Sequence, residues 1–108
     1  MALQAKAIKR NKMLIDKGAS AGEVVTFKLT SGEELVAKLV SETDAHYKIG
    51  RPMVIAMGQQ GPGLMPYLFT VNPNKEIKLA KSTVTVCEAT DKTFADQFIQ
   101  STTGIALG

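Results

Sequence analysis

The side chains best suited to chemistry stand close together between Glu42 and Tyr47, in the stretch ETDAHY. His46 is the only histidine of the chain, and Asp44 stands two residues before it. A histidine near a carboxylate is the arrangement that activates a serine in hydrolases. However, the chain has no strand–turn–helix serine motif of the G-x-S-x-G type. The sequence therefore predicts that the protein is not an enzyme.

Metal and cofactor binding are equally poorly supported. Glu42, Asp44 and His46 form the only local cluster of ligand-type side chains, and one histidine with two carboxylates is a weak ligand set. Cys87 is the only cysteine, which excludes an internal disulfide and a cysteine-based zinc site. The glycine-rich stretch Gly58–Gly63 lacks the lysine and the helix of a phosphate-binding loop. We expect no catalytic residue, no metal and no cofactor.

Length and charge restrict the class of protein. A chain of 108 residues is expected to form one domain, 1–108, and a net charge of +3 permits nucleic acid as a partner without requiring it. The N-terminal stretch is interrupted by Lys6, Lys9, Arg10 and Lys12, so it does not resemble a secretory signal. No apolar run reaches the length of a membrane span. We expect a cytoplasmic protein that does not bind membranes.

The elements that must position these side chains follow from periodicity. Residues 1–18 are rich in good helix formers and end at Gly18, which predicts a basic N-terminal helix. From Val24 to Leu39 apolar and polar residues alternate on either side of Gly32, which predicts a hairpin. Turn residues and prolines delimit the later elements. The third strand is expected over 45–58, with a bend at 50–52, and the fourth over 64–71. A short extended piece over 77–80, a fifth strand over 83–88 and a helix over 91–103 follow.

The predicted order is therefore helix, five strands over 23–88, and helix. Five short strands bent by glycine and proline predict an all-β fold, in which a strongly curved sheet closes or nearly closes on itself as a five-stranded barrel. The stretches MVIAM and LMPYLFTV are more apolar than a single small domain can bury.

The hairpin VTFKLTSGEELVAKLVSETD resembles the first motif of the Sm-like proteins, the family that includes bacterial Hfq. Gly32, Leu35, Ala37 and Leu39 stand where that motif has its turn glycine, its small residue and its apolar residues. The stretch IKLAKSTVTVCEA is similar to the shorter second motif, and the order of helix and five strands is also that of the family. The closing helix and the stretch TTGIAL are similar to compact members encoded by tailed bacteriophages.

The resemblance implies a homo-oligomeric ring of roughly five to seven subunits, in which the fourth strand of one subunit pairs with the fifth strand of the next. It also implies single-stranded RNA bound near the pore, in a bacterial or phage-infected cell. Bases would stack on the loop after the second strand, and basic side chains of the second motif would hold phosphates. The RNA-binding residues implied in this way are Asp44, His46, Tyr47, Lys78, Lys81 and Ser82.

An alternative stays open at this point. Tyr47 can instead pack beside Ile49, with His46 facing water and the lysines forming an ordinary solvated surface. Tyr47 stands where the family usually has an asparagine, and Ala80-Lys81 replaces its usual basic pair. The chain would then be a structural or protein-interaction ring of phage origin with no RNA site.

Overall fold

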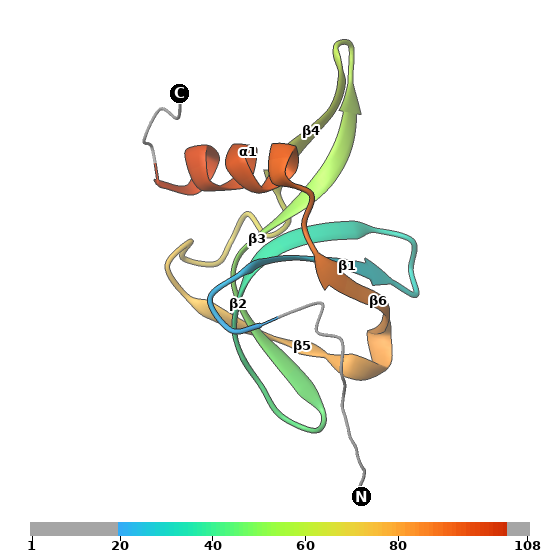
Figure 1. The fold of residues 1–108 in the computed structure, drawn as a ribbon, viewed down its shortest axis with the longest axis vertical. Coiled ribbons are helices and arrows are strands. Elements are labelled where there is room, and N and C mark those ends of the chain that lie inside the picture. Colours follow the sequence, from blue (N-terminus) through green and yellow to red (C-terminus); the bar gives the residue numbers. More distant parts are fainter. Residues whose placement is uncertain (1–19, 104–108) are drawn as a thin grey trace, which may run out of the picture.

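The computed structural model describes residues 20–103, and this part of the chain is mostly β (Figure 1). Six strands form one antiparallel sheet, accompanied by one short 3-10 helix and one α-helix. The elements are β1 (Val24–Leu29), β2 (Glu34–Glu42), β3 (His46–Gly58), β4 (Gly61–Pro66), β5 (Glu76–Ala80), η1 (Lys81–Thr83), β6 (Val84–Ala89) and α1 (Lys92–Thr103). The C-terminal helix is thus confirmed, whereas the helix expected over 1–18 lies outside the described residues.

β3 pairs with three strands, of which β4 and β5 each take a different half of it. The strand order is β4-β3-β2-β1-β6, and β5 pairs with the first half of β3 while β4 pairs with the second half. β5 and β6 follow one another through η1, yet no pairing joins them within residues 20–103, so the sheet is not closed. The expected all-β architecture is therefore confirmed, whereas the sheet has six strands instead of the expected five and remains open between β5 and β6.

The predicted interruption of the third strand is a sharp bend at Arg51. Pairing with β5 ends at Gly50 and pairing with β4 begins at Met53, so the strand changes partner across this bend. Arg51 has φ of +53°, a left-handed conformation that costs a non-glycine residue free energy. Its guanidinium donates from Nη1 to the carbonyl of Thr102. It also donates from Nη2 to Oδ1 of Asn74 at 2.7 Å. Arg51 therefore ties the bend to the end of α1 and to the segment before β5.

The fourth strand differs from the one expected over 64–71. Gly58 pairs with Gly61, so the turn has two residues and the strand begins earlier than the glycine-rich sequence indicates. The strand ends at Pro66, and the nine residues that follow form no strand before β5 begins at Glu76. The short extended piece expected over 77–80 is part of β5. Its pairing with β3 makes it an element of the sheet.

Apolar side chains gather on both faces of the sheet. The first core lies inside its curve, where β1, β2 and β3 contribute Val25, Phe27, Leu29, Leu35, Ala37, Leu39 and Ile49. The second core lies under α1, where Val36 and Met53 pack with Phe98 of the helix. The predicted alternation of β2, with Leu35, Ala37 and Leu39 on one side and Val36 on the other, is confirmed.

The free edge of β4 has few hydrogen-bond donors. The N–H of Tyr67 donates to the carbonyl of Pro52 at 3.0 Å. This bond shows which residues of β4 direct their N–H groups toward β3, namely the odd-numbered ones. By antiparallel alternation Pro62, Leu64 and Pro66 turn their backbone nitrogens away from β3. Two of these three residues are prolines, which have no N–H to donate. The outer edge of β4 is therefore protected against pairing with another strand.

β5 and β6 have more open edges. The N–H of Lys81 donates to the carbonyl of Ala45 at 2.8 Å, so Lys78 and its even-numbered neighbours in β5 direct their N–H groups away from β3. The N–H of Thr90 donates to the carbonyl of Val24 at 3.0 Å, which directs the N–H groups of Cys87 and Ala89 away from β1. In residues 20–103 neither edge has a partner strand.

Candidate functional site

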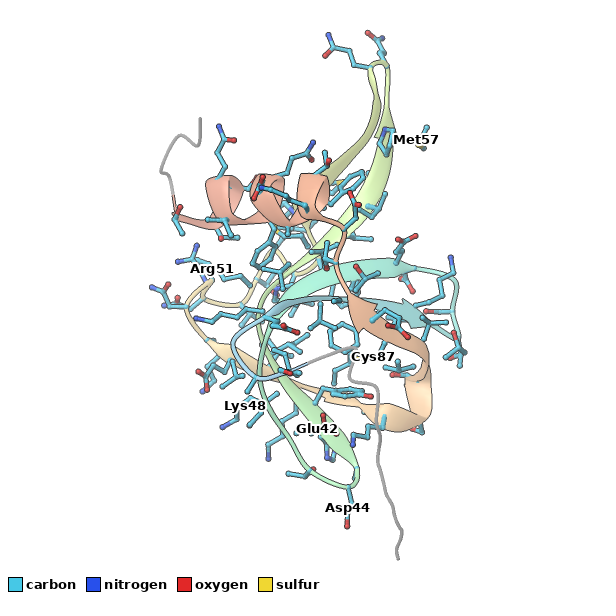
Figure 2. All side chains as sticks on the ribbon, in the orientation of Figure 1. Glu42, Asp44, Lys48, Arg51, Met57 and Cys87 are labelled. Atoms are coloured by element: carbon cyan, nitrogen blue, oxygen red, sulfur yellow. The ribbon has the colours of Figure 1, made fainter. Side chains whose placement is uncertain are left out.

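Thr43 organises the turn between β2 and β3. Its N–H donates to the carbonyl of His46 at 2.8 Å, and its Oγ1 accepts from the N–H of His46 at 3.1 Å. Asp44 belongs to the same turn, and its carboxylate has no hydrogen bond among the described residues. Asp44 lies instead at the exposed tip of the turn (Figure 2). Thr43 was missed as the organising residue, because a threonine hydroxyl is a weaker turn signal than the carboxylate of the adjacent aspartate.

Strand alternation divides the predicted site residues between two faces. His46 lies opposite Ala80 and shares its face of the sheet with Lys48 and Lys78, which are directly opposite each other. Tyr47 lies opposite Leu79 and points to the other face, toward the first core. The structure therefore brings His46 together with Lys78. Tyr47 belongs to a second group on the opposite face.

Tyr47, Lys81 and Glu42 form this second group, which we call the Tyr47 cluster. The Tyr47 ring packs against Phe27 with 5.0 Å between centroids and 56° between planes. The Nζ of Lys81 lies 5.0 Å from the Tyr47 centroid and 2.7 Å from Oε2 of Glu42. A nucleic-acid base can therefore stack on Tyr47 only by replacing Lys81 over the ring. Glu42 was missed as a member because its pairing with Tyr47 depends on the register of the hairpin.

The half-buried position of Tyr47 perturbs its ionisation. Burial, followed by the charges of Cys87 and Glu42, raises the pKa of Tyr47 to about 12 from an ordinary value of 10.0. Burial likewise raises the pKa of the Cys87 thiol, which favours the neutral form of that side chain. The cluster therefore consists of the Lys81–Glu42 ion pair and a neutral phenol ring beneath Lys81.

We expect Tyr47→Phe to change how stability depends on alkaline pH. Because the pKa of Tyr47 is higher in the folded state than in the unfolded state, the folded state holds its proton more tightly. Ionisation of Tyr47 therefore lowers the stability of the wild-type protein as pH rises from about 10 to about 12. The variant has no phenol at this position, so its stability should fall less over the same pH range. Urea unfolding of both proteins from about pH 9 to about pH 12 measures the difference. Identical pH profiles would contradict this account of Tyr47.

The His46 side of the sheet forms a second feature, which we call the polar hollow. It is a cavity of about 200 Å³ between the β2–β3 turn and β5. Its lining residues are Ser41, Glu42, Thr43, His46, Lys48 and Lys78. Two hydroxyl groups, an imidazole and two ammonium groups can donate hydrogen bonds there.

The charge of the polar hollow favours an anion. Glu42 is engaged by Lys81 at 2.7 Å, and Lys48 lies 3.7 Å from Glu76. Lys78 makes no ion pair with any residue of the described region. Lys48 was missed by sequence reasoning, although its position two residues after His46 on a strand is the signal that could have found it. The hollow could hold a phosphate group.

Ser82 joins neither group. It is exposed on η1 and does not line the polar hollow. Within residues 20–103 no three His, Cys, Asp or Glu side chains are placed to hold a metal ion. The same residues include no helix long and apolar enough to cross a membrane.

The positive charge of the chain is unevenly distributed. Residues 20–103 contain eight of the 13 Lys and Arg residues but nine of the 10 Asp and Glu residues. The sheet and α1 are therefore almost neutral as a whole. The excess positive charge lies in residues 1–19, where Lys6, Lys9, Arg10, Lys12 and Lys17 stand with one acidic residue, Asp16.

Comparison with known proteins does not assign the chain to a family. No protein-family model matches the chain, and a search of the curated proteins finds no match either. A function must therefore be inferred from the two groups of residues, the free strand edges and the distribution of charge.

Proposed function

We propose that this chain is a non-catalytic, ring-forming Sm-like protein that binds single-stranded RNA. The observation that carries the proposal is the contact between the β2–β3 turn and the η1 corner, where the N–H of Lys81 donates to the carbonyl of Ala45 at 2.8 Å. This contact joins the two segments to which the Sm resemblance assigns RNA binding. An aromatic ring and several cations therefore meet at one end of the sheet, which is the combination that single-stranded RNA requires.

The two groups have different roles in this proposal. The polar hollow takes a phosphate, which His46, Lys48 and Lys78 bind by charge and hydrogen bonds. The Tyr47 cluster takes a base, which stacks on the phenol ring once Lys81 has moved from it. A strand of RNA that crosses the β2–β3 turn reaches both faces in succession. Residues 1–19 add the long-range attraction that the almost neutral sheet does not supply.

The free strand edges support assembly. We propose that β5 of one copy pairs with β6 of the next, because these edges keep their N–H groups whereas the prolines of β4 remove most of its donors. Such pairing would also cover Val86, which is 48% exposed on β6. It differs from the pairing first expected, which used a fourth strand over 64–71. Repetition of one head-to-tail interface produces a closed ring, of roughly five to seven copies in Sm-like proteins.

We expect the double variant Lys78→Gln/Lys81→Gln to bind RNA at least about tenfold more weakly than wild type at low salt. Fluorescence anisotropy with labelled uridine-rich and adenine-rich oligonucleotides, repeated at increasing salt, measures the affinity and its salt dependence. The salt slope should fall by about one for each lysine removed. Lys28→Gln/Lys92→Gln makes the same charge change at exposed sites on β1 and α1 and serves as the matched control. Equal losses in the two double variants would show attraction to net charge alone.

A structural ring without RNA is the second candidate. It is favoured by the contacts inside the Tyr47 cluster, where Glu42 already neutralises Lys81 and Lys81 already occupies one side of the ring. Under this alternative the protein assembles, yet no oligonucleotide binds at low salt. Light scattering coupled to size-exclusion chromatography, run beside the anisotropy experiment, separates the two candidates.

A further inference from the structure

A second cavity lies away from the proposed RNA site. It has a volume of about 190 Å³ and is bounded by the β3 bend, the segment between β4 and β5, and the end of α1. Met53, Leu68, Val71 and Ile77 give it apolar walls. None of its lining residues belongs to the polar hollow or to the Tyr47 cluster. Any ligand of this cavity would therefore be separate from the proposed RNA.

The charged side chains that line this cavity, among the described residues, are both cations. Arg51 and Lys75 both line it, and no Asp or Glu is found among the described residues that do so. Arg51 has five N–H groups, of which its bonds to Thr102 and Asn74 use two. Lys75 makes no ion pair within residues 20–103. Positive charge next to apolar walls favours a ligand that combines an anionic group with an apolar body.

The guanidinium of Arg51 is held in place before any ligand arrives. Its bonds to α1 and to Asn74 fix the side chain, and they help to compensate the left-handed backbone of the residue. Arg51 also lies beside the last carbonyl groups of α1, whose partial negative charge it offsets. Figure 2 shows Arg51 beneath this end of the helix. A fixed, planar donor group matches the two oxygens of a carboxylate.

We propose that this cavity binds a small organic carboxylate. The apolar body of the ligand would lie against Met53, Leu68 and Ile77, and its carboxylate would face Arg51 and Lys75. Pockets for drug-sized ligands usually measure about 300–1,000 Å³, so a cavity of about 190 Å³ takes a smaller molecule. A straight or branched acid of about eight non-hydrogen atoms has the right size, and its affinity should be about millimolar.

NMR titration of the full-length ¹⁵N-labelled chain tests this proposal, with hexanoate as the probe and hexanol as its uncharged analogue. We expect saturable shifts of amide signals around Met53, Val71 and Ile77 with hexanoate. Hexanol should bind at least about tenfold more weakly, because it cannot pair with the two cations. Shifts scattered outside the cavity, or equal binding of the two probes, would overturn the proposal.

Substitutions at exposed positions test the site without relying on Arg51, whose replacement could unfold the bend. Val71→Asp puts a negative charge at the rim, where Val71 is 37% exposed, and should weaken hexanoate binding at least about tenfold. Met57→Asp puts the same charge at a residue that is 77% exposed on β3 and does not line the cavity, and it should leave hexanoate binding unchanged. Lys75→Gln should weaken hexanoate binding about threefold or more. Unchanged hexanoate affinity in Val71→Asp would contradict the proposed site.

Discussion

Phe27→Ala is expected to lower the free energy of unfolding by about 3–5 kcal/mol, which is much of the stability of a domain of this size. Phe27 is fully buried in the first core, and its ring centroid lies 5.0 Å from that of Tyr47. Removing the ring leaves a cavity between β1 and β3 that the curved sheet cannot close without shifting several strands. Urea unfolding at a fixed protein concentration measures the loss, since assembly makes stability depend on concentration.

The same substitution at Phe69 provides the control. Phe69 is 75% exposed in the segment between β4 and β5, so Phe69→Ala should change the free energy of unfolding by no more than about 0.5 kcal/mol. The comparison isolates burial, because the two variants remove the same atoms. Comparable losses in both variants would mean either that Phe27 does not lie in the core or that Phe69 is buried by a neighbouring copy. Repeating the measurement at lower protein concentration distinguishes these two explanations.

The regular part of the fold was readable from local alternation. Val25, Phe27 and Leu29 of β1 and their partners on β2 alternate with polar residues, and a half-buried antiparallel hairpin requires this pattern. The bend at Gly50–Pro52 was equally visible, because proline cannot continue a ladder. Closure of the sheet was not readable in this way, because it depends on whether two edges distant in sequence meet.

The fourth strand shows why an apolar run can mislead. Apolar residues continue past Pro66, yet Leu68, Phe69 and Val71 are exposed in a segment that forms no strand. Hydrophobicity indicates that a side chain needs cover and does not say whether the cover comes from the same chain. Two of these residues, Leu68 and Val71, instead line the cavity beside Arg51.

The candidate site was only partly predictable for a similar reason. His46 and Lys48 share a face by simple alternation, and this relation was available from the sequence. The pairing of Lys48 with Lys78 depends on the register of two strands joined by a long connection, which no local pattern specifies. The ion pair of Glu42 with Lys81 joins residues 39 positions apart, so it also depends on strand pairing that no local pattern specifies.

Ala89→Pro is expected to break the proposed ring while leaving each subunit folded. The N–H of Ala89 points away from β1, so proline there removes a donor from the free edge of β6 and places its ring in the path of an incoming strand. The dissociation constant of the assembly should rise by about tenfold or more. Light scattering coupled to size-exclusion chromatography should show smaller species, and circular dichroism should show an intact fold.

Glu88→Pro is the matched control. Glu88 directly precedes Ala89 and is also exposed, but its N–H points in the opposite direction. Its N–H points toward β1, where Glu88 lies opposite Thr26, so proline at this position breaks the ladder inside the subunit. This variant should lose about 2–3 kcal/mol of stability whether or not the protein assembles. If Ala89→Pro kept the molar mass of the wild-type assembly, the β6 edge could not be the interface. If Ala89→Pro lost as much stability as Glu88→Pro, the assigned direction of the two N–H groups would be wrong.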